Sequence, residues 1–210
     1  MKSIFRIDTG ASRLTDSQGR RFDPSSRRWR EDPTGAPGGG ESADARAAVR
    51  WLQRGSGAPL RTPIGVIGPR DATPIQMDAS RQIGAGLAHM GLTVICGGRH
   101  GVMEAVAQGA SDAGGVSIGL LPDATTEHAN PYLTHVIATG IGEARNALIA
   151  RAALCLVVIG DSYGTLSEVA LGLQFGKRVF GLEGAARIEG VEHCRDPDDA
   201  LEAVALCVLG

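Results

Sequence analysis

The pattern of hydrophobic positions divides this chain into two parts. From Thr62 onward, short aliphatic runs alternate with longer segments in which apolar residues recur every three to four positions. The run Ile64–Ile67 is typical of a buried strand, and the segment 74–90 carries its apolar residues along one helical face. This alternation predicts an α/β fold, a Rossmann-like doubly wound parallel sheet with helices on both faces.

The predicted elements follow one another without long gaps. Strands are expected at 64–67, 93–96, 116–121, 136–138, 154–159 and 179–182, and helices at 74–90, 102–113, 142–153, 165–175 and 198–206. The strand at 154–159 is the most apolar and is therefore expected near the centre of the sheet. Because crossovers between parallel strands are right-handed, the loops that leave the strands should share one edge, where residues distant in sequence can form one site.

The first 60 residues show a different pattern. They indicate two short strands, at 4–7 and at Arg21–Phe22, with a turn at 16–19 between them, and then a helix at 43–54. The segments 33–40 and 55–59 are rich in Gly and Pro, a composition typical of linkers. We therefore predict two regions, a basic N-terminal extension with its linker at 1–60 and a ligand-binding Rossmann-like domain at 61–210.

Charge is unevenly distributed along the chain. The formal net charge is −2, which does not indicate a nucleic-acid-binding protein as a whole. The extension is nevertheless basic, since Asp8, Asp16 and Asp23 are outnumbered by Lys2, Arg6, Arg13, Arg20, Arg21, Arg27, Arg28 and Arg30. An interaction protein that uses this basic arm is one alternative function. A solvated appendage or a hairpin packed on a partner subunit is more common, so nucleic acid is not the favoured partner.

The cysteines and histidines do not form a recognisable metal site. None of the four cysteines belongs to a CxxC pair, and no histidine lies at ligand spacing beside them. Cys96 and Cys155 lie inside apolar runs and are expected in the core. Apolar runs are too short for a membrane-spanning helix, and Met1 does not begin a signal peptide. We therefore expect a cytoplasmic protein with no membrane partner.

The first predicted loop has the features of an anion site. It contains Gly68 and Arg70 and ends at Thr73 and Pro74, which are the expected N-cap and first residue of a helix. A helix start attracts anions, and Arg70 adds positive charge. An ordinary capped turn would explain the same residues equally well.

Two further segments add glycines and an arginine. The loop containing Gly97, Gly98 and Arg99 lets the backbone approach a phosphate, although it matches neither the dinucleotide fingerprint nor the P-loop. Arg145 lies near a predicted helix start, which is an unfavourable place for a cation. We therefore expect a negative partner for this side chain, which is either a ligand anion or one of the carboxylates of Glu143 and Glu168.

The loop at 160–168 follows the most apolar strand and begins a helix. Thr165 and Glu168 have the spacing of a capping box, in which each side chain accepts a hydrogen bond from the other residue's backbone. Taken by itself, this loop favours the capping role. A catalytic glutamate would occupy nearly the same position, so both interpretations stay open.

Three segments together resemble one family. The run Tyr163-Gly164-Thr165-Leu166-Ser167-Glu168 is similar to the end of the PGGxGTxxE motif of the Lonely Guy (LOG) superfamily, whose members are often mislabelled lysine decarboxylases. The segments 96–106 and 142–146 are similar to its second-strand turn and to the segment that holds its catalytic arginine, in the same order. LOG enzymes are phosphoribohydrolases that act on nucleoside 5′-monophosphates. The resemblance implies a homodimer, with Arg145 and Glu168 as the catalytic residues of such a hydrolase.

Departures from the LOG motif favour binding over hydrolysis. Asp161 and Ser162 stand where the family has glycines, and Asn146 stands where it has a lysine. In this respect the chain resembles the branch that includes the molybdenum-cofactor carrier proteins, which bind a phosphorylated pterin. We expect a nucleotide-type binding protein, such as a molybdenum-cofactor carrier, with an N-glycosidic-bond hydrolase of LOG type as the alternative.

The expected ligand is then the molybdenum cofactor or a nucleotide, and no catalytic cofactor or metal ion is required. Backbone N–H groups near Gly164 would hold the phosphate. The candidate ligand-contacting residues are Gly68, Arg70, Gly97, Gly98, Arg99, Arg145, Asn146, Ser162, Tyr163, Gly164, Thr165 and Glu168.

Overall fold

The computed structural model describes residues 5–31 and 40–210, and the chain divides into two compact units. The larger unit spans Arg61–Leu201, and the smaller one combines residues 1–60 with Glu202–Gly210. The predicted linker at 33–40 lies outside the described residues apart from Gly40, and so does Ile4 of the first predicted strand. Each unit contains its own sheet.

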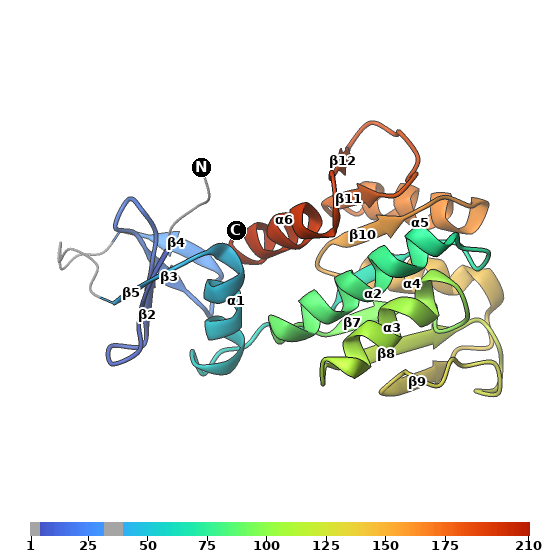
Figure 1. Ribbon diagram of the computed structural model, residues 1–210, viewed down its shortest axis with the longest axis horizontal. Coiled ribbons are helices and arrows are strands. Elements are labelled where there is room, and N and C mark those ends of the chain that lie inside the picture. The colour runs from blue at the N-terminus through green and yellow to red at the C-terminus, as the bar shows by residue number, and fades with distance from the viewer. Residues whose placement is uncertain (1–4, 32–39) are drawn as a thin grey trace. The chain divides into compact units, whose positions relative to one another are not determined.

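The larger unit is built on a seven-stranded sheet in the order β12-β11-β10-β6-β7-β8-β9 (Figure 1), and every pair of neighbours is parallel. The strands are β6 (Ile64–Ile67), β7 (Val94–Cys96), β8 (Ser117–Leu121), β9 (His135–Ala138), β10 (Leu156–Ile159), β11 (Val179–Leu182) and β12 (Val191–His193). The helices are α2 (Pro74–His89), α3 (Val102–Asp112), α4 (Asn146–Ala152) and α5 (Tyr163–Gln174), together with α6 (Pro197–Leu209), whose residues from Glu202 onward belong to the smaller unit. The predicted Rossmann-like α/β fold is confirmed.

The details differ from the prediction in two places. The helix predicted at 142–153 begins as a 3₁₀ turn, η1 (Gly142–Arg145), and becomes α-helical only from Asn146. The strand β12 was not predicted, because it is an edge strand with one apolar residue in three. The most apolar strand, β10, lies beside the middle strand β6, and all four of its residues are buried. Among the described residues, no helix is long and apolar enough to cross a membrane.

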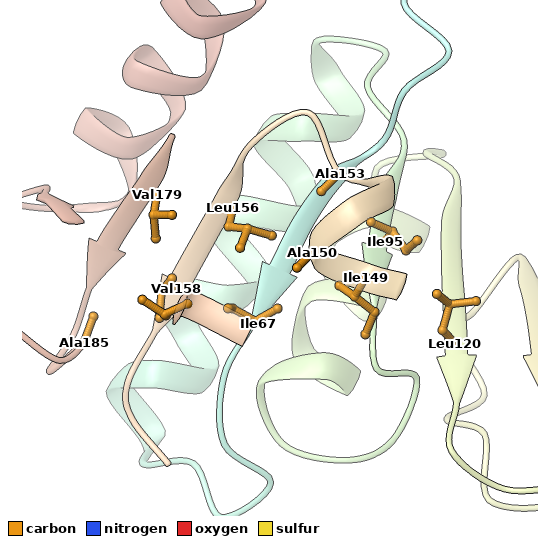
Figure 2. Packing of buried hydrophobic residues seen from close by; sticks show 11 residues of the cluster. Ile67, Ile95, Leu120, Ile149, Ala150, Ala153, Leu156, Val158, Val179 and Ala185 are labelled. Carbon is orange, nitrogen blue, oxygen red and sulfur yellow. The ribbon is translucent and has the colours of Figure 1, made fainter. Parts of the chain in front are cut away.

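Buried aliphatic side chains cover both faces of this sheet. On one face, Ile67 and Leu156 belong to a cluster that also includes Ile149 of α4 (Figure 2). On the opposite face, Val66 and Val157 are also completely buried. Burial on both sides explains why the strands appear in the sequence as continuous apolar runs without alternation.

The order of the strands fixes where a ligand can bind. From β6 the chain proceeds through β7, β8 and β9 on one side, and it then returns to place β10 on the other side of β6. The loops that follow β6 and β10 therefore leave the sheet in opposite directions. Such a reversal opens a crevice at the carboxyl ends of the two strands, which is the usual ligand site of doubly wound sheets.

The smaller unit contains a five-stranded antiparallel sheet in the order β4-β3-β2-β1-β5 and one helix, α1 (Ala45–Arg54). Its strands are β1 (Phe5–Asp8), β2 (Arg13–Thr15), β3 (Arg21–Asp23), β4 (Arg28–Arg30) and β5 (Glu41–Ala43). One face of the sheet is apolar. There the Trp29 ring stacks on Phe5, with 5.7 Å between centroids, and meets Phe22 edge-on at 5.1 Å. These aromatic pairs supply much of the apolar surface that so small a sheet needs.

Candidate functional site

A small cavity of about 90 Å³ lies at the predicted edge of the larger sheet. It is formed by the ends of β6 and β7, by η1 with the start of α4, and by the start of α5. Its lining consists of Ile67, Gly68, Arg70, Gly97, Met103, Glu143, Arg145, Asn146, Ser162, Gly164, Thr165 and Glu168. Segments separated by about a hundred residues in sequence therefore meet at one point.

A buried ion pair lies in this cavity. Arg145 Nη1 lies 3.3 Å from Glu168 Oε1, and both side chains are only 8% exposed. The same Nη1 donates to the side-chain oxygen of Asn146 at 2.7 Å, and the Asn146 amide donates to Ser167 Oγ at 2.9 Å. Asn146 therefore links the arginine to the first turn of α5 and fixes the orientation of the guanidinium.

Glu168 does not cap helix α5, contrary to the capping-box interpretation. The N-cap is Ser162, whose hydroxyl oxygen accepts a hydrogen bond from the backbone N–H of Thr165 at 3.1 Å. Thr165 is thus the third helical residue, and Glu168 lies one turn further along the helix. The Glu168 carboxylate instead faces Arg145 and is the negative partner expected for that cation.

Burial perturbs both members of the pair. Loss of water raises the pKa of the Glu168 carboxyl to about 7, while attraction to Arg145 acts in the opposite direction. Burial lowers the pKa of Arg145, and the Glu168 carboxylate opposes that shift. Near neutral pH the cavity thus contains a permanent cation beside a carboxyl group that exchanges its proton.

The cavity has unused hydrogen-bond donors. Arg145 Nε is buried and has no hydrogen-bond partner among the described residues. Gly164 and Thr165, in the first turn of α5, line the same cavity, and the N-terminus of a helix carries partial positive charge. A buried donor without an acceptor is costly, so this arrangement favours an anion as the missing partner.

Gly97 allows the guanidinium to enter the cavity. A Cβ atom at this position would lie 2.5 Å from Arg145 Nη2 and 2.6 Å from Met103 Sδ. Both distances are shorter than any normal contact. The glycine predicted here for approach of a phosphate to the backbone therefore also makes room for the arginine.

Arg70 and Glu143 lie at the opening of the cavity. Arg70 Nη2 is 3.8 Å from Glu143 Oε1, and the two side chains are 50% and 75% exposed. An exposed pair at this distance contributes little to stability. Arg70 is therefore free to exchange Glu143 for a ligand anion at low cost.

Nine of the twelve predicted site residues line the cavity, and three do not. Arg99 instead forms a two-point ion pair with Asp123, with Nε 3.0 Å from Oδ2. The carbonyl oxygen of Gly98 accepts a hydrogen bond from Asn130, and Tyr163 is 93% exposed. The departure Asp161 is also exposed and does not line the cavity.

Three lining residues are not marked by any strong sequence signal. Ile67 is the last residue of an apolar strand, and Met103 belongs to the first turn of α3. Glu143 was considered only as a partner for Arg145, whereas the structure places it nearer to Arg70. The positions of Ile67 and Met103, immediately before and after loops of the site, were the available clue.

No group of three or more His, Cys, Asp or Glu residues that could hold a metal ion occurs in the described parts of the chain, residues 5–31 and 40–210. Cys96 and Cys155 are completely buried, as expected. Burial raises the pKa of the Cys96 thiol to about 11, which makes it a poor nucleophile.

Comparison with known proteins identifies the family to which the larger unit belongs. The model of the SLOG cluster4 family matches residues 61–204. A molybdenum cofactor binding protein from the phototrophic bacterium Rippkaea orientalis is 34% identical with a TM-score of 0.68, and the match covers 71% of this chain and 99% of that one. A molybdenum cofactor carrier protein from Chlamydomonas reinhardtii is 32% identical with a TM-score of 0.65, covering 70% and 98% of the two chains.

An uncharacterized protein of Archaeoglobus fulgidus is 37% identical over 145 residues, which are 69% of this chain and 93% of the relative. The resemblance to the LOG superfamily near its molybdenum-cofactor-carrier branch is thereby confirmed. The family match begins at residue 61 and so leaves out the N-terminal 60 residues.

Proposed function

Since this chain belongs to the SLOG cluster4 family, we propose that its larger unit binds a phosphorylated pterin of the molybdenum-cofactor type and holds the phosphate at Arg145. The observation that carries the proposal is the buried Nε of Arg145, which lacks an acceptor beside the start of α5. Two solved relatives that bind or carry the molybdenum cofactor support the choice of ligand.

The size of the cavity indicates which part of the ligand enters it. A cavity of about 150 Å³ holds one benzene ring, and this one measures about 90 Å³. Only the phosphate group fits inside, and the pterin rings would lie across the opening. Tyr163, at the start of α5 and almost fully exposed, is available there for stacking against a flat ring.

The residues fit an anionic group chemically. Arg145 supplies a guanidinium and α5 supplies backbone N–H groups, which together form charge-assisted hydrogen bonds to phosphate oxygens. Arg70 adds a second cation at the opening when it leaves Glu143. A proton on Glu168 removes the one negative charge inside the cavity.

Thermal unfolding with a ligand panel tests this function. We expect the molybdenum cofactor to raise the Tm more than nucleoside 5′-monophosphates or inorganic phosphate do. At a concentration a hundredfold above its Kd, a bound ligand stabilises the folded protein by about 2.7 kcal/mol. Arg145→Met should abolish the shift. The control Arg151→Met removes a cation from the adjoining helix α4, outside the cavity lining, and should preserve the shift. If no member of the panel stabilises the protein, the proposal is wrong.

Hydrolysis of nucleoside 5′-monophosphates is the second candidate. It is favoured by the release of Glu168 from any capping role and by a pKa near 7, which suits a general base that activates water. Arg145 would then position the carboxylate and the phosphate. Release of free base from a panel of monophosphates, lost in Glu168→Gln, would establish this activity. Stabilisation by these nucleotides without release of base would leave binding as the function.

A further inference from the structure

The smaller unit carries five arginines on one face of its sheet. Directly opposed residues of antiparallel strands point to the same side, so the register defines two faces. One is the apolar face. The other carries Arg6, Arg13, Arg21, Arg28 and Arg30 together with the acidic residues Asp8 and Asp23. We call it the arginine face.

A row without any acidic residue crosses this face. The register places Ser42 opposite Arg6, Arg6 opposite Thr15, Thr15 opposite Arg21 and Arg21 opposite Arg30. Each residue of the row belongs to a different strand, so the row spans the whole sheet. Neighbouring strands lie about 4.8 Å apart, so its length is about 19 Å.

The charges of this row are poorly compensated. Arg21 and Arg30 are directly opposed like charges, a pair that destabilises a sheet. Asp23 relieves only Arg30, at 3.0 Å, while its other contacts are with the Ser25 and Ser26 turn. Among the described residues, Arg6 and Arg21 form no ion pair. Their positive charge is therefore available to a partner.

The middle of the row also lacks a hydrogen-bond acceptor. The Thr15 hydroxyl lies between Arg6 and Arg21, is buried, and has no partner among the described residues. An anionic oxygen between the two arginines would accept hydrogen bonds from both guanidinium groups and from the Thr15 hydroxyl. This is an observation independent of charge, and it points to the same ligand chemistry.

We propose that the arginine face binds the phosphate backbone of duplex nucleic acid without reading its sequence. The row is as long as the rise of about five to six base pairs, at 3.4 Å each. The aromatic residues of the strands, Phe5, Phe22 and Trp29, lie on the apolar face, so the strands offer no ring for base stacking on the arginine face. Arginine contacts to phosphate oxygens hold a protein on the duplex and carry no sequence information.

The sequence alone favoured a solvated appendage, because scattered basic residues are common. In the structure, five of these basic residues lie on one face of the sheet, and this arrangement favours an interaction surface over a solvated appendage. The surface also lies outside the segment that matches the family, which begins at residue 61. The proposal is therefore independent of the cofactor site, and Arg145→Met should leave nucleic-acid binding unchanged.

Fluorescence anisotropy of the full chain with a labelled mixed-sequence duplex of about 20 bp tests the proposal. With two phosphates neutralised by Arg6 and Arg21, the plot of log K against log salt concentration should have a slope of about −1.8. The double variant Arg6→Gln/Arg21→Gln should reduce that slope by about 1.8 in magnitude.

The control Arg61→Gln/Arg187→Gln removes two exposed arginines of the larger unit and the same net charge, and it should leave the slope unchanged. Equal slopes for the two double variants would overturn the proposal, as would absence of binding by the wild type at low salt. Tighter binding of polyglutamate than of the duplex would assign the face to an acidic protein instead. Should the double variant unfold, Arg21→Gln alone must reduce the magnitude of the slope by about 0.9.

Discussion

Gly97→Ala is the sharpest test of the cavity, because the added methyl group would occupy the space that now holds the Arg145 guanidinium. Its Cβ would lie 2.5 Å from Arg145 Nη2 and 2.6 Å from Met103 Sδ. Normal contacts are about 3.5–4.0 Å, so the arginine must move by about 1 Å. The backbone of Gly97 is not in the left-handed region, so alanine causes no strain of its own there.

The expected loss is in affinity more than in stability. A hydrogen bond from a charged donor contributes about 1.5–3 kcal/mol. Loss of one such bond to the ligand phosphate weakens binding by about 10- to 150-fold, since 1.4 kcal/mol corresponds to a factor of ten. Both atoms that must move are ends of flexible side chains. We therefore place the cost to the free energy of unfolding near the lower end of the range of about 1–3 kcal/mol for overpacking.

Isothermal titration with the molybdenum cofactor, together with urea unfolding, separates the two effects. Gly10→Ala is the control, because its nearest neighbour would be a side-chain oxygen 3.5 Å away. It should change neither quantity beyond the usual gain from a less flexible unfolded chain. A Gly97→Ala protein of unchanged stability and unchanged affinity would show that the ligand does not depend on Arg145 as it lies here.

Four other changes probe the same structure. Sulfate binding should weaken as the pH rises through about 7, because Glu168 then loses its proton and neutralises Arg145; Glu168→Gln should remove this dependence in titrations at different pH. Asn146→Ala removes hydrogen bonds of 2.7 and 2.9 Å and should cost about 1–3 kcal/mol in urea unfolding, so an unchanged midpoint would contradict the linking role. Ser162→Ala should cost about 0.5–2 kcal/mol through loss of the N-cap, and a Tm equal to the wild type would refute that assignment. In Gly84→Ala the methyl group would meet a backbone oxygen at 2.1 Å, so its cost in thermal unfolding should exceed about 1 kcal/mol.

Periodicity was sufficient for the larger unit because its sheet is buried on both faces. The central strands are continuous apolar runs, and each helix has one apolar stripe, so the two patterns are easily distinguished. The strands of the smaller unit have three or four residues, and β2, β3 and β4 each carry one apolar residue directly after an arginine. Such short segments fix no period, and β2, β4 and β5 were missed for that reason.

The predicted site residues were found by a rule of topology. Loops that follow parallel strands share one edge, so Gly68, Gly97 and Ser162 could be expected to meet. The prediction failed for Arg99 because this side chain forms a local contact outside the cavity. Arg99 lies in the correct loop, but Asp123 of the next strand's loop takes its guanidinium. A sequence does not show which of two nearby carboxylates an arginine will choose.

The role of Glu168 depended on a shift of three residues at the start of α5. With Thr165 as the N-cap, Glu168 would be the third helical residue and would turn back to the cap. With Ser162 as the N-cap, the same carboxylate lies a turn deeper and faces Arg145 at 3.3 Å. Helix starts are the least predictable part of a sequence-based assignment. A shift of three residues in the start of α5 therefore decided between a capping role for Glu168 and a place in the cavity beside Arg145.

The Arg145–Glu168 pair also explains how one cavity could serve either candidate function. When Glu168 holds a proton, the pair has a net positive charge, and an anion can be bound without a catalytic base beside it. When Glu168 is ionised, the pair is neutral and the carboxylate can accept a proton from water. Asn146 adds no charge where a lysine would add a second cation, so the net charge of this pair depends on one proton alone. With a pKa near 7, neutral pH populates both states, and the ligand's own charge selects between them.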